Sequence, residues 1–422
     1  MLSITNLKKK SFLIYGLGSS GQSVIKFFKK NKIKDFKIWD DKKKNLFKKK
    51  KLKEILNNVD YIVISPGISL LRNEYLTKFK KKIITDIDLF YATNKIFKSI
   101  VVTGTNGKST TCKLINHLLK KNNFNVLLGG NIGTPVLNLK IKKNSFVVIE
   151  ASSFQLYHSK FIRPDYAILL NITNDHLDWH GNMSHYRNSK LKIFKLQQKN
   201  NFALINKKLE NFFKKKKFKS KLIILREKNY LKIKNKIKNY YLKLGINDEN
   251  MSFAYTFSKM IKISEKNFII AANSFVGLSH RYEVFLKKKN ITFVNDSKAT
   301  SFVSTKFALS CSKNVYWILG GLPKKNDRIF LQGIKNNIIK CYLVGKNVKF
   351  FQKQIENVIN YSITNNLKKT LIKILKDIKV SKVQENTILF SPAAASYDQF
   401  INFEKRGDEF KRLSKIYARK FI

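Results

Sequence analysis

The sequence predicts an α/β protein with parallel sheets, divided among three domains. The chain has 422 residues, enough for two to four domains at roughly 100–200 residues each. Short continuous apolar runs recur along it, and each is followed by a glycine-bearing turn and then a helical pattern. Such runs are typical of strands buried on both faces, which belong to parallel sheets covered by helices. We expect the domains at residues 1–97, 98–277 and 278–422.

The expected strands lie in seven apolar runs. In chain order these are SFLIYGLGSSG (11–21), DYIVISPG (60–67), SIVVTGTNGKST (99–110), FVVIEASS (146–153), YAILLNIT (166–173), VYWILGG (315–321) and KCYLVGK (340–346). The first boundary falls in segment 80–100, because a nucleotide-binding pattern starts again there. The second falls near GLSHRYE (277–283), after which a new strand, ITFVNDS (291–297), begins. The lysine-dense stretch 205–245 has interleaved apolar residues that suit surface helices.

The charge balance is strongly basic, but it does not by itself indicate a nucleic acid partner. Lys and Arg number 84 against 27 Asp and Glu, a formal net charge of +57. Nine of the basic residues are Arg and 75 are Lys, and the Lys are spread over the whole chain. A nucleic-acid-binding protein usually concentrates charge on one face and favours Arg for its bidentate geometry. We therefore attribute the Lys excess to compositional drift and expect no nucleic acid partner.

The cysteines and the N-terminus favour a cytoplasmic protein. Cys112, Cys311 and Cys341 are widely spaced and odd in number, so they predict neither a metal pair nor a disulfide framework. The N-terminus lacks the apolar region and cleavage site of a signal peptide. No window reaches the roughly 18 uncharged apolar residues of a membrane-spanning helix. We expect no membrane partner and a monomeric protein.

The clearest motif is a glycine-rich loop between a predicted strand, IVVT, and a predicted helix. It consists of Gly104, Thr105, Asn106, Gly107, Lys108, Ser109 and Thr110. A phosphate-binding loop needs open backbone N–H groups, a lysine for the β- and γ-phosphates and a hydroxyl for Mg²⁺. All of these are present, although the first glycine lies three residues before Gly107 rather than five. The motif predicts a central P-loop ATPase-like domain with ATP and Mg²⁺ as ligands.

A second glycine-rich turn, GLGSSG (16–21), also lies between a predicted strand and a predicted helix. Asp40 ends the strand FKIWD about twenty residues later. This is the fingerprint of a dinucleotide site, with pyrophosphate at the helix N-terminus and the carboxylate on a ribose. A dinucleotide-dependent oxidoreductase is therefore one interpretation. Because the next domain has an ATP-type loop, we favour a Rossmann-like domain that binds a UDP-linked substrate.

Further polar residues follow predicted strands of the central domain. Glu150 comes directly after FVVI, where a Mg²⁺ ligand would reach bound phosphates, and His176 follows YAILL beside acidic residues. A single histidine of this kind more often has a capping or core role. Lys190, in YRNSKLKIF, would by itself be interpreted as an ordinary surface lysine.

The C-terminal third contains four polar motifs. They are HRYE (280–283), NDSKATS (295–301), GGLPKKND (320–327) and SPAAASYDQFINFEKRGDEF (391–410). Arg281 and Asp296 place a cation and an anion near two turns, and Lys298 and Lys324 could bind a carboxylate. In so basic a chain, a single charged residue is weak evidence for a binding site, whereas a fixed combination such as NDSKAT is stronger evidence.

Taken in order, these motifs resemble the Mur ligase family from about residue 11 to 410. The resemblance also includes SPG (65–67), GGNIG (129–133), EASSFQL, NDHLDWH and YRNSK. GTNGKST marks the superfamily, which includes folylpolyglutamate synthetase, whereas NDSKAT and the DQF-x-x-F-E-x-R-G tail indicate the D-glutamate-adding branch. The resemblance implies a Rossmann-like third domain. It also implies a cytoplasmic, ATP-dependent ligase that adds D-glutamate to UDP-N-acetylmuramoyl-L-alanine through an acyl phosphate.

The resemblance implies a role for each matching residue. Gly104 to Thr110 would hold the ATP phosphates, with Lys108 on the transferred one. The adenine and ribose positions are Asn247, Asn250, Arg281 and Asp296. The Mg²⁺ positions are Ser109, Glu150, His176 and Lys190, the last as a carbamate. The UDP-sugar positions are Ser19, Ser20, Asp40 and Asn131. The D-glutamate positions are Lys298, Thr300, Lys324, Ser396 and Phe403.

Three residues depart from the family pattern, and three alternatives stay open. Trp179 replaces the usual Arg, Ile246 the usual His and Ala394 a Cys, but none of these changes removes a group that the chemistry requires. One alternative is another ATP-dependent amino-acid ligase of the same superfamily. The others are an oxidoreductase that uses only the N-terminal fingerprint and a basic nucleic-acid-binding module.

Overall fold

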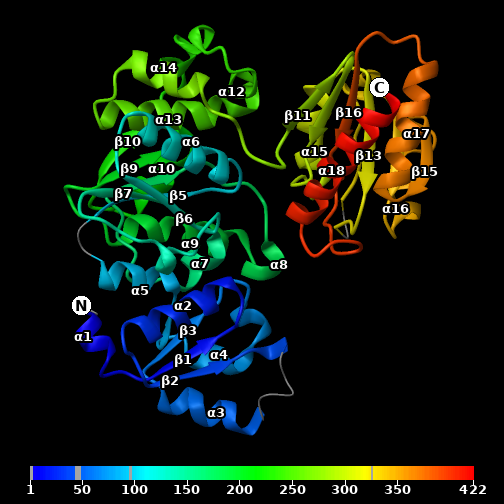
Figure 1. The fold of residues 1–422 in the computed structure, drawn as a ribbon. Helices are drawn as coiled ribbons and strands as arrows, with labels where there is room; N and C mark the ends of the chain where they lie inside the picture. The colour runs from blue at the N-terminus through cyan, green and yellow to red at the C-terminus, as the bar shows by residue number, and fades with distance from the viewer. Residues whose placement is uncertain (1–2, 43–48, 95–96, 325–326) are drawn as a thin grey trace. The chain divides into compact units, whose positions relative to one another are not determined.

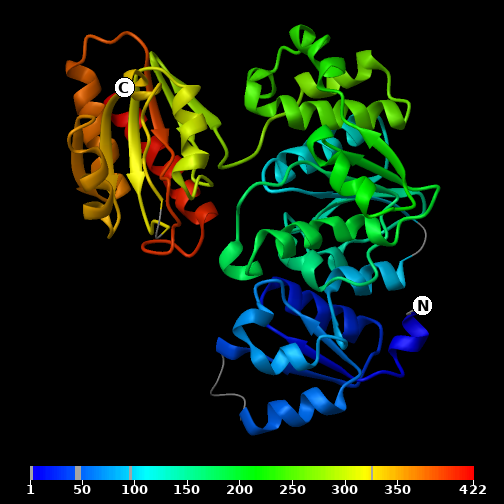
Figure 2. The same cartoon turned by 180° about the vertical axis from the view of Figure 1, so that it is seen from behind.

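The computed structural model describes residues 3–42, 49–94, 97–324 and 327–422. The chain forms two compact units, Met1–Phe275 and Val276–Ile422. The first unit contains two parallel sheets and the second contains one mixed sheet, each flanked by helices (Figure 1, Figure 2).

The first unit begins with a four-stranded parallel sheet in the order β2-β1-β3-β4. Its strands are Phe12–Tyr15 (β1), Phe36–Trp39 (β2), Tyr61–Ile64 (β3) and Ile83–Ile84 (β4). Its helices are Ile4–Leu7 (α1), Ser19–Lys30 (α2), Lys49–Asn58 (α3), Glu74–Lys78 (α4) and Asp86–Thr93 (α5). Ile14 of β1 packs with Phe28 of α2, whereas Leu13 packs in a second core with Leu56 of α3. Both faces of β1 are therefore buried, which explains its continuous apolar sequence.

The second sheet of this unit has six parallel strands in the order β10-β9-β8-β5-β7-β6. They are Phe97–Thr103 (β5), Val126–Gly130 (β6), Ser145–Glu150 (β7), Tyr166–Leu169 (β8), Phe202–Ile205 (β9) and Lys221–Ile224 (β10). The helices are Lys108–Lys121 (α6), Ser153–His158 (α7), Leu177–His180 (α8), Met183–Lys195 (α9), Glu210–Lys215 (α10), Glu227–Leu231 (α11), Tyr240–Lys243 (α12), Asp248–Met260 (α13) and Glu265–Asn273 (α14). Helices α7 and α9 cover one face, and α6 with α13 covers the other (Figure 1). The carboxyl ends of parallel strands share one edge, so the loops after β5, β6, β7 and β8 lie near one another.

The second unit has a six-stranded sheet in the order β11-β12-β16-β13-β14-β15. Only the β11-β12 pair is antiparallel. The strands are Glu283–Lys288 (β11), Ile291–Asn295 (β12), Val315–Gly320 (β13), Ile338–Val344 (β14), Tyr361–Asn365 (β15) and Asn386–Phe390 (β16). The helices are Phe302–Ser310 (α15), Val348–Ile355 (α16), Leu367–Val380 (α17) and Phe403–Phe421 (α18). Leu371 of α17 and Phe410 of α18 share one core with Ile318 of β13.

Short 3₁₀ helices complete the described secondary structure. They are Leu70–Arg72 (η2), Val136–Asn138 (η3), Lys207–Leu209 (η4), Lys234–Lys236 (η5), Gly245–Asn247 (η6) and Lys335–Asn337 (η7). Within the described ranges, no helix has both the length and the apolar character needed to cross a bilayer.

The α/β fold class is confirmed, and each of the seven apolar runs contains a strand. The interpretation of stretch 205–245 as surface helices was incomplete, because it also contains β10 between two lysine-rich segments. This strand pairs only with β9 at the sheet edge and is partly exposed, so it lacks the apolar run of a central strand. The predicted boundary at 277/278 lies two residues from the unit boundary. The predicted boundary at 97/98 lies inside the first unit and stays a prediction.

Candidate active site

The glycine-rich loop lies between β5 and α6 at the carboxyl edge of the central sheet. Gly107 precedes the first residue of α6 and has a left-handed backbone, with φ +81°. A Cβ at this position would lie 2.2 Å from Oδ1 of Asn250. Glycine is therefore required by both conformation and space. The first N–H groups of α6 and the positive end of its dipole are directed at the loop, as in an anion-binding site.

Two lysine amines converge on the carbonyl oxygen of Gly104. Nζ of Lys108 donates to this oxygen at 2.9 Å and to the Thr105 carbonyl at 2.7 Å. Nζ of Lys190 donates to the same Gly104 oxygen at 2.8 Å. Lys190 is only 1% exposed, and its Nζ lies 4.5 Å from the centre of the Tyr186 ring. Lys108 thus places a positive charge at the loop, and the buried amine of Lys190 also bonds to the loop backbone.

The buried environment of Lys190 disfavours its ammonium form. Burial, followed by repulsion from the Lys108 ammonium, holds the pKa of Lys190 well below its usual range, although Asp175 acts in the opposite direction. A lysine in such a site has a larger neutral fraction and is more nucleophilic than an exposed one. The local sequence of Lys190 would by itself indicate an ordinary surface lysine, whereas the side chain is buried.

Glu150 is the last residue of β7, which lies between β5 and β6 in the sheet. It is 2% exposed, and its neighbours in the sheet are Val102 and Gly130. Its Oε1 accepts a hydrogen bond from Nδ2 of Asn131 at 2.9 Å. Its Oε2 is buried and has no hydrogen-bond partner among the described residues. A buried carboxylate oxygen without a donor is costly, so this oxygen is suited to a cation.

His176 lies in the loop after β8 and has a left-handed backbone, with φ +52°. Its Nε2 is 3.3 Å from Oδ2 of Asp175, and its ring packs on Phe154 with centroids 4.7 Å apart. Asp175 also acts electrostatically on Lys190, so these residues lie together near the phosphate loop. Within the described ranges, no three His, Cys, Asp or Glu side chains gather closely enough to hold a metal by themselves.

Trp179, which replaces the Arg usual in the family pattern, lies in an aromatic cluster. Trp179 is buried and packs against Phe154, Tyr157 and His180. Its carbonyl oxygen accepts a hydrogen bond from the Ser69 hydroxyl at 3.1 Å. A cation at this position would have to enter an aromatic cluster, so the loop that bears His176 is held here by packing rather than by charge.

The four residues predicted for the UDP-linked substrate line one cavity of about 710 Å³. Ser19 and Ser20 begin α2, Asp40 follows β2, and Asn131 follows β6. Asp40 accepts backbone N–H groups of Leu17 at 2.7 Å and Lys42 at 2.9 Å, which shapes the glycine-rich turn. The hydrogen bond from Asn131 connects this cavity to Glu150, which lies beside the strand β5 that leads into the phosphate loop.

Sequence reasoning assigned only part of this cavity. Its lining also includes Gly16, Leu17, Gly18, Asp41, Lys42, Ser65, Pro66, Gly67, Ile68, Gly130 and Gln155. SPG (65–67) and EASSFQL contain four of these residues and contributed to the resemblance. Their roles in the cavity could not be assigned because the segments meet only in the folded chain.

Asn247 and Asn250 lie behind the phosphate loop. Oδ1 of Asn250 accepts from the Thr111 hydroxyl at 3.2 Å, and its Nδ2 donates to Oδ1 of Asn247 at 3.2 Å. Nδ2 of Asn247 donates to the Tyr241 carbonyl at 2.7 Å. Both amides are buried and support the start of α6. Their assignment to adenine or ribose stays a prediction.

In the second unit, Asp296 holds the turn that carries Arg281. Its Oδ1 accepts the N–H of Tyr282 at 3.1 Å, and its Oδ2 accepts the Ser391 hydroxyl at 2.6 Å. Burial raises the pKa of Asp296 to about 7, although both hydrogen bonds and the Arg281 charge favour the carboxylate. The structure therefore brings Arg281 and Asp296 close enough for the Arg281 charge to act on Asp296, while their assignment to ATP stays a prediction.

The predicted D-glutamate residues lie on four segments of the same unit. Nζ of Lys298 lies 3.7 Å from the centre of the Phe403 ring, and Thr300 is half-buried two residues after Lys298. Ser396 is buried beside Ala395, which exchanges backbone hydrogen bonds of 2.8 and 2.9 Å with Leu322. Lys324 is exposed two residues beyond Leu322, and residues 325–326 of the GGLPKKND motif lie outside the described ranges.

The chain is similar to known proteins over nearly its full length. Residues 102–275 match the family model of the Mur ligase middle domain. The chain is 36% identical over 449 residues to UDP-N-acetylmuramoylalanine--D-glutamate ligase of Rickettsia prowazekii, covering 97% of this chain and 98% of that protein. The chain belongs to the Mur ligase family. This confirms the family and the ligase class that the motifs indicated.

A second relative and two solved structures agree with Mur ligase membership. The UDP-N-acetylmuramoylalanine--D-glutamate ligase of Buchnera aphidicola is 36% identical over 439 residues, or 96% of this chain and 98% of that protein. MurF from Thermotoga maritima in complex with ADP has 15% identity and a TM-score of 0.58, covering 98% and 99% of the two chains. MurC from the same organism has 16% identity and a TM-score of 0.58, covering 97% and 100%. At such low identity, these structures show a shared fold.

Proposed function

We propose that this chain uses ATP to join D-glutamate to UDP-N-acetylmuramoyl-L-alanine in cytoplasmic peptidoglycan precursor synthesis. The observation that carries the proposal is the hydrogen bond between Asn131 and Glu150. It connects a cavity suited to a UDP-linked substrate with the carboxylate at the end of β7, beside the strand β5 that leads into the phosphate-binding loop, in a chain whose relatives are named for this reaction. An oxidoreductase or a nucleic-acid-binding module would leave that connection without a role.

The reaction has two bond-forming steps. The γ-phosphoryl group of ATP passes to the alanyl carboxylate, which gives an acyl phosphate and ADP. The neutral amine of D-glutamate then attacks the acyl carbon, and the tetrahedral intermediate expels phosphate to leave the amide. Negative charge develops on phosphoryl oxygens in the first step, where Lys108 and the N–H groups at the start of α6 stabilise it.

Ser109, Glu150, His176 and a carbamate on Lys190 would hold Mg²⁺. The unpartnered Oε2 of Glu150 supports this assignment, because it is a buried anionic oxygen with no protein donor among the described residues. The ion would neutralise charge on phosphate oxygens. Ser109, in the first turn of α6, would add a neutral oxygen beside the loop.

The environment of Lys190 suits carbamoylation. A neutral amine attacks CO₂, a nitrogen–carbon bond forms, and one proton is released, which leaves a carboxylate on the side chain. The depressed pKa of Lys190 supplies more of the neutral amine. An ammonium at this position would repel the metal, whereas a carbamate would attract it.

D-Glutamate would bind in the second unit. Its two carboxylates require cations and hydroxyl donors, which Lys298, Lys324, Thr300 and Ser396 provide, and its methylene groups can pack on Phe403. These five residues include no carboxylate for the distal ammonium of lysine or diaminopimelate. The adenosine roles of Asn247, Asn250, Arg281 and Asp296 remain predictions.

We further propose that the two sheets of the first unit are separate domains, 1–97 and 98–277, and that the protein acts as a monomer on small molecules. The clusters around β1 are distinct from the cluster around β7, which also takes in Ile87 and Phe90 of α5, and this supports the division.

The deciding experiment measures phosphate release from ATP in the presence of UDP-N-acetylmuramoyl-L-alanine and one amino acid at a time. We expect D-glutamate to stimulate release, and L-alanine, L-lysine and meso-diaminopimelate to have little effect. Efficient use of one of these three would assign the chain to another branch. Omitting the UDP-linked substrate is the control for uncoupled ATP hydrolysis.

A further inference from the structure

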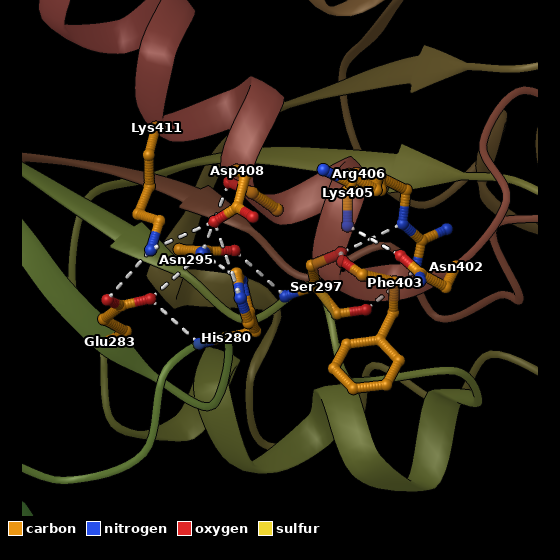
Figure 3. A network of polar contacts seen from close by, with 11 residues as sticks. His280, Glu283, Asn295, Ser297, Asn402, Phe403, Lys405, Arg406, Asp408 and Lys411 are labelled. Atoms are coloured by element: carbon orange, nitrogen blue, oxygen red, sulfur yellow. Dashed lines mark hydrogen bonds and ion pairs between the residues drawn. The ribbon is translucent and has the colours of Figure 1, made fainter. Parts of the chain in front are cut away.

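A buried guanidinium in the second unit connects two of the segments that carry the predicted D-glutamate residues (Figure 3). Arg406 lies in the first turn of α18 and is 3% exposed. Its Nε donates to the Ser297 hydroxyl at 3.0 Å, and its Nη2 donates to the carbonyls of Ser297 at 2.8 Å and Ala394 at 2.9 Å. Ser297 directly precedes Lys298, and Ala394 lies two residues before Ser396. Arg406 therefore sets the separation between the turn with Lys298 and the loop with Ser396.

The other two segments meet the same group. The Ser297 hydroxyl, which accepts from Arg406, donates to the carbonyl of Phe403 at 2.9 Å. A Cβ added to Gly321 would lie 3.0 Å from Nη1 of Arg406, so the chain that leads to Lys324 passes directly over the guanidinium. All four segments that carry the five predicted residues thus touch Arg406 or its partner Ser297.

The start of α18 is held in place on its other side. A Cβ added to Gly407 would lie 2.3 Å from Nδ1 of His280 and 3.0 Å from Oδ1 of Asn295, so the helix packs directly on these side chains. One turn later, Nζ of Lys411 is 3.3 Å from Oε1 of Glu283 (Figure 3). The backbone from which Arg406 extends is therefore packed against His280 and against Asn295 at the end of β12.

The contacts require the shape of arginine and not only its charge. A planar guanidinium directs several N–H donors at fixed angles, whereas a lysine ammonium is one compact centre. One ammonium cannot occupy the positions of both Nε and Nη2, which bond to different atoms of Ser297 and to Ala394. Arg406 is buried, and its Nη1 has no hydrogen-bond partner among the described residues.

We propose that Arg406 is a positioning residue that assembles the D-glutamate pocket by fixing the turn 296–300 against the loop 394–396 and Phe403. The inference rests on the proposed function of this unit. Its consequence is selective: loss of the guanidinium should separate the groups that bind D-glutamate, while the cavity and the phosphate loop of the first unit keep their own contacts.

The test compares Arg406→Lys with Arg412→Lys in the full-length protein. Arg412 lies on the exposed side of the same helix, and its hydrogen bonds among the described residues go to Glu409 of that helix, so it is a matched control. For each protein, the Michaelis constants for D-glutamate, ATP and UDP-N-acetylmuramoyl-L-alanine are measured, with circular dichroism as a check of folding. We expect Arg406→Lys to raise the constant for D-glutamate roughly tenfold or more, as for loss of charge-assisted hydrogen bonds, and the others less than about twofold.

Two further variants keep the proposal falsifiable if Arg406→Lys does not fold. Ser297→Ala removes one acceptor of Arg406 and the bond to Phe403, and it should raise the D-glutamate constant with smaller effects on the other two. Arg406→Ala should regain part of its D-glutamate affinity when millimolar guanidinium is added, which a purely structural defect would not do.

The outcomes separate the two proposals. If the wild type uses D-glutamate and a folded Arg406→Lys keeps its D-glutamate constant, or if all three constants rise together, the positioning role is wrong and the proposed function stands. A wild type that does not use D-glutamate overturns the proposed function, and the positioning role with it.

Discussion

Lys190 lies where a positive charge is poorly tolerated. Its Nζ is buried against Tyr186 and shares the Gly104 carbonyl with Lys108. A second ammonium so near Lys108 adds repulsion to the cost of desolvation, and both lower the pKa of Lys190. Conversion of its amine to a carbamate would replace this repulsion by attraction to Lys108 and to a metal ion.

Lys190→Ala should be nearly inactive and should recover part of its activity when acetate is added, because acetate restores an anion in the vacated space. The measurement is phosphate release with and without acetate. Lys195→Ala, an exposed lysine on the same helix, is the control and should keep wild-type activity without acetate. Rescue by methylamine instead of acetate would show that a cation is needed and that carbamoylation is wrong.

Lys108→Ala should lower turnover roughly 1,000-fold or more, since it removes the cation nearest the transferred phosphoryl group. Affinity for the UDP-linked substrate should stay nearly unchanged, because Lys108 does not line the cavity of Ser19, Ser20 and Asp40. Steady-state rates and calorimetric titration of that substrate measure the two effects. Lys120→Ala, exposed near the end of α6, is the control. Near-normal ligation by Lys108→Ala would disprove the assignment of the ATP site.

At the scale of elements, the phosphate loop is shaped by α13 as well as by its own glycines. Asn250 of α13 lies against Gly107 and accepts a hydrogen bond from Thr111 of α6. The loop therefore has no room for a side chain at Gly107, and its left-handed backbone also disfavours one. Loop and supporting helix act as one anion-binding element.

Gly107→Ala should lower ATP affinity at least tenfold, because the new Cβ would push Asn250 and the start of α6 apart. Binding of a fluorescent ATP analogue measures the effect. Gly333 is a matched control, since its φ is +78° but a Cβ there would meet nothing within 4 Å. Gly333→Ala should cost only about 1 kcal/mol of stability through its backbone. Equal effects of both substitutions on ATP binding would show that the contact with Asn250 is unimportant.

The turns of the second unit lead to a separate prediction on substrate choice. Lys298→Ala and Lys324→Ala should each raise the Michaelis constant for D-glutamate roughly 10–150-fold, the range for a lost charge-assisted hydrogen bond to a buried carboxylate. The constant for ATP should change much less. Lys306→Ala, exposed on α15, is the control. A larger effect on ATP than on D-glutamate would contradict the assignment of this pocket.

At the scale of the whole molecule, the dominant feature is the charge of +57. Like charges spread over a folded surface repel one another and destabilise the compact state. Few described lysines are offset by acidic partners, because Asp and Glu number only 27. Stability should therefore depend on screening by salt more than in a protein of balanced charge.

Raising NaCl from low concentration to about 0.5 M, where the screening length is only several ångströms, should raise the thermal unfolding midpoint by several degrees. KCl at equal ionic strength should give the same shift, because screening depends on ionic strength and not on the identity of the cation. Differential scanning fluorimetry measures both series. A midpoint that falls with salt would mean that specific ion pairs outweigh the general repulsion.

The sequence alone determined the features that depend on neighbouring residues. Buried parallel strands require continuous apolar runs, so β1, β5, β7 and β13 could be predicted. A phosphate loop is contiguous, so residues 104–110 could be assigned from their chemistry. The family resemblance then supplied roles for Glu150, His176 and Lys190 that their local sequence did not indicate.

Tertiary structure decided what depends on segments far apart in the chain. Burial of Lys190, the bond between Asn131 and Glu150, and the raised pKa of Asp296 arise where separate loops meet. The same holds for Arg406. Arginine is usually a surface residue, so its identity alone does not indicate that this side chain is buried among four segments. Charge and hydrogen bonding inside a protein depend on desolvation by distant neighbours, and local sequence does not specify those neighbours.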